Sequence, residues 1–149
     1  MKFNEEQRPL PFVVGETHFA LKAYMDQRMK ELDSPLRAPE GKLLRILCLG
    51  PKEGMTFNDL QKKCRVQKAT LSETLSNLNE RRLITYSLDS ADKRKKLFSA
   101  TDEGFAVSKQ NRILIEKVAS EMEEGLTEGE KVLLRSICLK LRKNVGEQE

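Results

Sequence analysis

The spacing of apolar residues along the chain predicts a mostly helical protein. Leu71, Leu75 and Leu78 recur at intervals of four and three, which places them on one face of a helix. Similar spacing recurs before and after this segment, and a short stretch with a period of two interrupts it near the middle of the chain. The helices predicted in this way cover residues 16–32, 39–49, 56–64, 67–82, 101–124 and 127–145.

Proline and capping residues support these boundaries. The first helix is expected to end before Pro35, because a residue that precedes proline avoids the α-helical region. Pro39 suits the first turn of the next helix. Thr56 and Thr127 each stand three residues before an acidic residue, which is the spacing of a capping box. Residues 1–15 are rich in proline and glycine and are predicted to be an irregular arm.

A β-hairpin is predicted after the helix at residues 67–82. Residues 83–87 alternate between apolar and polar side chains, as a half-buried strand does. A polar turn follows at 88–93, and the return strand is predicted at 95–100, with Leu97 facing inward.

The composition is that of one soluble domain. The chain has 149 residues, of which 38% are hydrophobic and 34% charged. No apolar run approaches the roughly 20 residues of a membrane span, and the first residues lack the apolar core of a signal peptide. Three widely spaced cysteines fit reduced thiols better than a disulfide framework. These features predict a cytoplasmic protein with no membrane attachment.

Positive charge is concentrated in one quarter of the chain. Residues 61–98 hold ten lysines and arginines against four acidic residues, a net charge of +6, whereas the whole chain carries +4. Such asymmetry is typical of a surface that binds a polyanion. A solvated lysine-rich face is the alternative interpretation.

The order helix, helix, helix, strand, turn, strand is that of a winged helix-turn-helix. In this order and spacing, the chain resembles the MarR family of bacterial transcription regulators over roughly residues 36–145. The segments that carry the resemblance are Leu43-Leu44-Arg45-Ile46-Leu47, Met55-Thr56-Phe57-Asn58-Asp59-Leu60, residues 66–72, Leu78-Asn79-Glu80-Arg81-Arg82-Leu83-Ile84, Asp92-Lys93-Arg94, Ala100-Thr101-Asp102-Glu103-Gly104 and Gly125-Leu126-Thr127-Glu128-Gly129-Glu130.

The resemblance implies a fold class and a division of the chain. The fold is expected to be mostly α with a small β-wing, a winged helix-turn-helix core with N- and C-terminal dimerisation helices. Residues 1–149 would form a single MarR-like domain. Within it, 39–100 would be the DNA-binding lobe, and 1–38 with 101–149 the dimerisation helices.

The helix at 67–82 is the expected recognition helix. A helix fits the major groove of DNA, where base edges display a distinguishable pattern of donors and acceptors. The inward leucines leave short polar groups outside, Ser76 among them, and family analogy places the groove-facing positions near the helix start. The predicted DNA-binding residues of this helix are Gln67, Lys68, Ala69, Thr70, Ser72, Glu73 and Asn77.

Two residues depart from what the family resemblance leads us to expect. Glu73 stands where relatives carry a basic or neutral side chain, so it would accept a hydrogen bond from cytosine, repel phosphate, or pair with a neighbouring arginine. Tyr86 stands where an arginine is common, so it would stack on a wing residue, donate to a phosphate, or pack half-buried.

The turn of the hairpin carries the second set of predicted DNA contacts. Asp92 and Arg94 are two residues apart, so the carboxylate is expected to hold the guanidinium in a fixed orientation. The family's Asp-x-Arg wing implies that Arg94 enters the minor groove, where narrow A·T-rich DNA attracts arginine. Lys93, Lys95 and Lys96 would contact phosphates and make binding salt-dependent.

The remaining reactive side chains give weaker signals. His18 is expected to be structural, with sensing of pH or a ligand as the alternative. Cys48 and Cys138 fall on apolar stripes and are expected to be inert. Cys64 is flanked by three cations that would lower its pKa, which makes it the one candidate for redox sensing.

The outer helices carry more apolar surface than the DNA-binding lobe requires, which indicates an interface between two copies. Two-fold pairing would set the recognition helices about 34 Å apart, one turn of DNA. The resemblance also implies a crevice between the helical region and the lobe, formed by the first, second and fifth helices, that would accept a small aromatic effector. No cofactor is expected.

The leading hypothesis is therefore a sequence-specific, homodimeric transcription regulator. It would act as a repressor that binds double-stranded DNA at a palindromic operator, and a small effector would release it. The alternative is a winged helix module that binds proteins and not DNA. An enzyme is the least supported class, because one histidine and scattered acids provide no acid–base pair, metal site or nucleophile.

Overall fold

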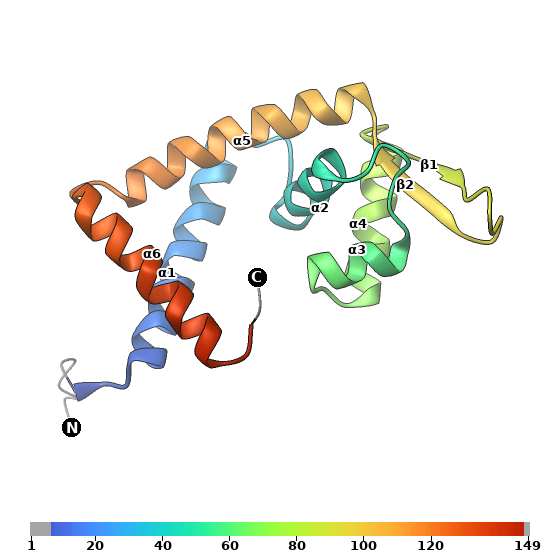
Figure 1. Cartoon of the computed structure of the whole chain (residues 1–149). Helices are drawn as coiled ribbons and strands as arrows, with labels where there is room; N and C mark the ends of the chain where they lie inside the picture. Colours follow the sequence, from blue (N-terminus) through green and yellow to red (C-terminus); the bar gives the residue numbers. More distant parts are fainter. Residues whose placement is uncertain (1–6, 148–149) are drawn as a thin grey trace. The chain divides into compact units, whose positions relative to one another are not determined.

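The structure is a computed structural model that describes residues 7–147. The chain divides into two compact units, Met1–Val118 and Ala119–Glu149. The elements follow one another along the described chain (Figure 1) as α1 (Leu10–Glu31), α2 (Ala38–Leu49), α3 (Phe57–Cys64), α4 (Lys68–Glu80), β1 (Ile84–Leu88), β2 (Lys96–Ala100), α5 (Asp102–Met122) and α6 (Glu128–Asn144).

The hydrophobic core of the first unit lies where α2, α3 and α4 meet the start of the hairpin. Each helix contributes one apolar face, and Leu71, Leu75 and Leu78 of α4 are all buried, as their spacing predicts. The remaining buried apolar residues of this core are Leu36, Leu43, Leu44, Leu47, Met55, Leu60, Cys64, Leu83 and Ile84.

The two strands form an antiparallel hairpin. Their register runs from Ile84 opposite Ala100 to Leu88 opposite Lys96. Met55, just before α3, adds a bridge to the same sheet, because its N–H donates to the Phe98 carbonyl at 2.8 Å and its carbonyl accepts from the Phe98 N–H at 2.9 Å. The hairpin is thereby fixed to the turn that precedes α3, and the predicted wing is confirmed with shifts of one residue.

The first helix is longer than its sequence predicts. Residues 10–15 belong to α1 and not to an irregular arm, so the predicted start at Glu16 is wrong. Pro11 lies in the first turn, where no intrahelical N–H donor is needed, so it is compatible with the helix. The first six residues of the predicted arm lie outside the described part of the chain.

A left-handed residue lies between the end of α4 and the start of the hairpin. Arg82 has φ of 57°, a conformation that favours glycine. Its carbonyl accepts a hydrogen bond from the Thr101 hydroxyl at 2.8 Å, which joins the end of α4 to the start of α5. A Cβ on Gly104 would lie 2.0 Å from the Leu83 carbonyl oxygen, so this contact between α5 and the hairpin requires glycine.

The second unit holds the last turn of α5 and all of α6. Thr127 caps α6, because its hydroxyl accepts from the Glu130 N–H at 3.2 Å and the Glu130 carboxylate accepts from the Thr127 N–H at 2.8 Å. The capping box predicted from the sequence is confirmed. Neither α1 nor α6 contains a buried residue.

Candidate nucleic-acid interface

The face of α4 opposite the core is polar and open. Of the residues predicted from this helix to contact DNA, Asn77 is half-buried and the others are exposed. Thr74, which shares the inward face with the leucines, is buried, and its hydroxyl donates to the Thr70 carbonyl at 2.7 Å. The helix therefore separates its packing residues from a row of short polar side chains of the size that reaches base edges.

The start of α4 differs from the starts of α3 and α6. Thr56 accepts from the Asp59 N–H at 3.2 Å, which caps α3. Gln67, at the N-cap of α4, makes no such side-chain bond, and the first turn of α4 holds no acidic residue. The first N–H groups of this helix, together with the exposed Lys68, therefore favour an anion such as a DNA phosphate.

Backbone and side-chain hydrogen bonds shape the turn of the wing. The Asp89 N–H donates to the Lys95 carbonyl at 2.9 Å, and the Lys95 N–H donates to the Asp92 carbonyl at 2.9 Å. The Asp89 carboxylate accepts from the Ala91 N–H at 2.8 Å. These bonds close a tight loop that presents Lys93, Arg94 and Lys95, all exposed, at the tip.

Asp92 orients Arg94, as the sequence predicts. The Arg94 Nε lies 3.1 Å from Asp92 Oδ1, and its Nη2 lies 3.4 Å from Oδ2. The Arg94 N–H also donates to Oδ1 at 3.1 Å. These hydrogen bonds, the one to the side chain first, hold the pKa of the Asp92 carboxyl below its ordinary value. Asp92 therefore holds the guanidinium as a carboxylate, while 92% of the Arg94 side chain remains exposed.

Glu73 and Tyr86, the two departures from the family pattern, lie on α4 and on the hairpin. Glu73 is exposed and makes no ion pair with any described residue, so the alternative in which it pairs with a neighbouring arginine is not found among residues 7–147. Tyr86 packs on the hairpin beside Phe98, with ring centroids 6.1 Å apart, and the Lys96 ammonium lies 4.3 Å from the Tyr86 ring centroid. Tyr86 therefore supports a cation of the wing while 45% of it is exposed.

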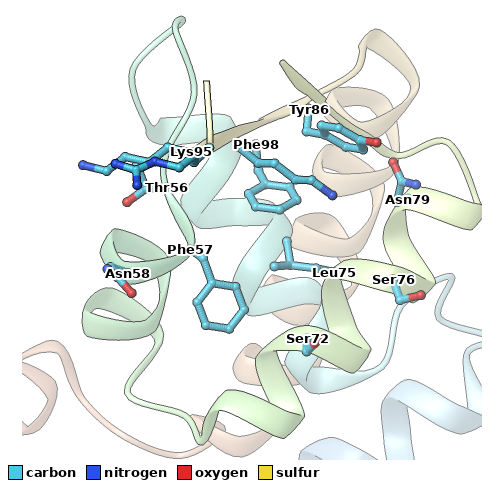
Figure 2. Close-up of a pocket in the computed structure, with 12 residues that line it drawn as sticks. Thr56, Phe57, Asn58, Ser72, Leu75, Ser76, Asn79, Tyr86, Lys95 and Phe98 are labelled. Carbon is cyan, nitrogen blue, oxygen red and sulfur yellow. The ribbon is translucent and has the colours of Figure 1, made fainter. Parts of the chain in front are cut away.

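A hollow of about 530 Å³ lies between α3, α4 and the hairpin. Figure 2 shows Phe57, Leu75 and Phe98 pointing into it, with polar side chains around them. Arg94, Lys95 and Lys96 line it from the wing. The hollow gives the polar face of α4 and the basic wing a common border.

The structure adds one residue, Asn79, to the polar face of α4 that the sequence interpretation described. Ser76 and Asn79 line the hollow beside Ser72. Asn79 follows Ser72 by seven residues, the spacing of one helix face, so extending the predicted face by two residues beyond Asn77 identifies it.

The redox prediction for Cys64 is wrong in its direction. The side chain is buried, and burial raises the pKa of the Cys64 thiol more than the nearby charge of Lys42 lowers it. Its carbonyl accepts from the Lys42 ammonium at 2.7 Å. The three flanking cations are exposed, and the charge that lowers the pKa of this thiol is that of Lys42.

The other single candidates have no partners that suggest chemistry. Burial also raises the pKa of the Cys48 thiol, as expected for an inert cysteine. His18 is exposed within α1, beside Phe19. Among residues 7–147, no three His, Cys, Asp or Glu side chains are placed to hold a metal ion. Over the same residues, no helix has the length and apolarity to cross a membrane.

A larger cavity, of about 1160 Å³, lies within the first unit. Its walls come from α1, α2 and α5, the three helices that the resemblance implies for an effector crevice, and from the segment between α1 and α2. Its lining combines apolar side chains such as Met25, Ile46 and Ile115 with charged groups such as Arg37 and Glu40. Such a lining suits a molecule with an apolar body and a polar end.

Comparison with known proteins identifies the fold. Residues 36–104 match the family model of the winged helix DNA-binding domain. The MepR–DNA complex of S. aureus superposes with a TM-score of 0.75 at 21% identity, covering 93% of this chain and 99% of that one.

Two further solved structures have the same fold. BpsR of Bordetella bronchiseptica, whose DNA binding is regulated by 6-hydroxynicotinic acid, gives a TM-score of 0.76 at 23% identity, covering 99% and 100% of the two chains. A MarR-family transcriptional regulator from Rhodococcus sp. RHA1 gives 0.74 at 17% identity, covering 92% of each. The predicted winged helix is confirmed, and the resemblance to the MarR family is confirmed at the level of the fold.

Proposed function

We propose that this chain, which shares its winged helix fold with MarR-family structures, is a sequence-specific DNA-binding transcription regulator. The observation that carries the proposal is the joint presentation of a polar helix face and a basic wing on one side of a packed lobe. The helix α4 would enter the major groove through Gln67, Ala69, Thr70, Ser72 and Glu73, with Asn77 deeper on the same face. Regulation through binding, and not catalysis, is the activity proposed.

The wing would supply the second part of the contact. Arg94 is held by Asp92 yet exposed along its length, so it can enter a narrow minor groove with little loss of conformational freedom. Lys68, Lys93 and Lys95 would contact phosphates and add salt dependence. Residues 39–100 are proposed as the DNA-binding lobe.

A homodimer is proposed from the helices outside the lobe. In α6, large apolar side chains such as Val132, Leu133 and Leu134 are exposed, and in α1 Leu10, Phe12 and Phe19 are. Exposed apolar residues at this density indicate a surface that another chain covers. Residues 1–38 and 101–149 would bury these faces between two copies and set the two recognition helices about 34 Å apart on an inverted repeat.

Release from DNA by a small aromatic effector is proposed for the larger cavity. BpsR, which has this fold, is regulated by 6-hydroxynicotinic acid, an aromatic acid. Here the cavity lies against α2 and includes Arg81, the residue that ends α4, so a molecule bound there would touch the helix that reads DNA. Repression of transcription from a bound operator is the expected outcome in a cytoplasmic regulator.

Selection from a pool of random duplexes tests the proposed function. The purified chain should enrich an inverted repeat with half-site centres about one helical turn apart, and affinity should fall steeply as salt is raised. Sedimentation in the same buffer should give a dimer. A flat salt titration on mixed duplex DNA, with no sequence enriched, would instead favour a winged helix that binds proteins.

A further inference from the structure

A buried carboxylate joins the recognition helix to α2. Glu40 lies in the first turn of α2, and only 5% of it is exposed. Its carboxylate accepts from the Arg37 N–H at 2.9 Å and pairs with Arg81 Nη1 at 3.4 Å. The other terminal nitrogen of Arg81, Nη2, donates to the Pro35 carbonyl at 2.7 Å.

Arg81 stands where α4 ends. Its backbone N–H donates to the Asn77 carbonyl at 3.2 Å, so its backbone belongs to the last turn of the helix while its side chain holds α2 and the preceding segment. The 13 residues of α4 form a rigid rod about 20 Å long. A change in how one end is held therefore moves the groove-facing side chains at the other end.

The chemistry of this joint requires an arginine. One planar guanidinium reaches a carboxylate and a carbonyl in different directions, which a lysine ammonium on a flexible stem does not reproduce. Glu40 in turn needs the cation, because a buried carboxylate without a partner is unfavourable. Arg37 also pairs with this carboxylate, with its Nη2 3.2 Å from Glu40 Oε1. Arg37 belongs to the same end of α2, however, and provides no link to α4.

We propose that Arg81 is a positioning residue for DNA binding and that Glu40 acts with it. The leucines of α4 fix its depth in the core, and the Arg81–Glu40 pair fixes the angle at which its polar face is presented. The inference rests on the proposed function, because it assigns a role in the same DNA contact. The competing role for Arg81, whose side chain is 41% exposed, is a direct contact with a phosphate.

The experiment compares Arg81→Gln, Arg81→Lys, Glu40→Gln and the double variant Arg81→Gln/Glu40→Gln on the selected operator. The single Gln variants should each weaken binding about fivefold to tenfold, and the double variant should be no weaker than the worse single variant. Arg81→Lys should restore little of the loss. The slope of affinity against salt should stay that of the wild type, since no phosphate contact is removed.

The neighbouring arginine provides a matched control. Arg82→Gln removes the same charge one residue along the chain, outside the joint, and so reports what loss of charge alone does. The inference would be overturned if Glu40→Gln bound DNA like the wild type while Arg81→Gln weakened binding and lowered the salt slope by about one. That result would identify a contact between Arg81 and a phosphate.

A second measurement needs no DNA. Hydrogen exchange of the amides of residues 78–83 should be faster in Arg81→Gln and in Glu40→Gln than in the wild type, and unchanged exchange would overturn the inference. A wild-type chain that bound no duplex at all would overturn the proposed function, and this inference with it. If the wild type binds the operator and the Arg81 and Glu40 variants bind it equally well, the inference is overturned and the proposed function stands.

Discussion

The Asp92 carboxylate and the Arg94 guanidinium form a two-point contact at the tip of the wing, with Nε 3.1 Å from Oδ1 and Nη2 3.4 Å from Oδ2. No packing against the lobe holds Arg94, whose side chain is 92% exposed. Its orientation is therefore set within the turn itself. The Asp92 contact therefore restricts the orientation of a guanidinium that is otherwise surrounded by solvent.

Arg94→Ala should lower operator affinity by about tenfold, within the 1–3 kcal/mol that a good contact contributes. Fluorescence anisotropy with the selected operator measures the change. Asp92→Asn keeps the arginine and loosens it, so a smaller loss is expected. Equal affinity of Arg94→Ala and wild type at low salt would remove Arg94 from the mechanism.

The capping box of α3 predicts a specific pH dependence of stability. Hydrogen bonds from Thr56, the side-chain one first, hold the pKa of the Asp59 carboxyl below its ordinary value of 3.8. A carboxyl whose pKa is lowered in the folded state stabilises that state at pH values above its ordinary pKa. This contribution is lost as the pH falls through the lowered pKa.

Asp59→Asn should therefore be less stable than the wild type near neutral pH, and the difference should shrink below about pH 4. Because the carboxyl is solvent-exposed, the effect is expected to be small. Urea midpoints at several pH values measure it. A difference that stays constant from neutral to acidic pH would show that ionised Asp59 contributes nothing.

Cys64 should resist alkylation in the folded protein. The thiolate is the reactive form, and burial both shields this thiol and raises its pKa. Iodoacetamide at neutral pH, followed by mass spectrometry, should leave Cys64 unmodified while the unfolded chain in urea reacts at all three cysteines. Rapid labelling of Cys64 in the native protein would restore it as a redox candidate.

Gly104→Ala should destabilise the lobe by about 1–3 kcal/mol. The added methyl would meet the Leu83 carbonyl oxygen at 2.0 Å, and that oxygen belongs to backbone that also anchors Thr101. Gly15→Ala in α1 is the matched control, because nothing lies within 4 Å of its added carbon. The control should be neutral or slightly stabilising. Chemical denaturation distinguishes the two, and equal midpoints would contradict the prediction.

The lobe could be predicted from the sequence because its signals are local. The interval between Leu71, Leu75 and Leu78 sets the inner face of α4 by helical geometry alone. The capping boxes at Thr56 and Thr127 need only a threonine and an acid three residues apart. The wing pair, Asp92 with Arg94, is likewise confined to one turn.

What could not be predicted depends on residues far apart in the chain. The pairing of Arg81 with Glu40 joins residues 41 positions apart, and no local sequence pattern around either residue predicts the pair. The burial of Cys64 results from packing against α2, whereas its sequence neighbours suggested an activated thiol. The start of α1 was missed because proline is compatible with the first turn of a helix as well as with irregular chain.

The two faces of α4 share no side chain: the leucines that hold the helix in the core are distinct from the exposed residues proposed to read DNA. The proposed function and the stability of the lobe therefore depend on separate sets of residues in this helix. Under the proposed function, substitutions at the outer positions would change which DNA is bound, while unchanged inner positions keep the fold.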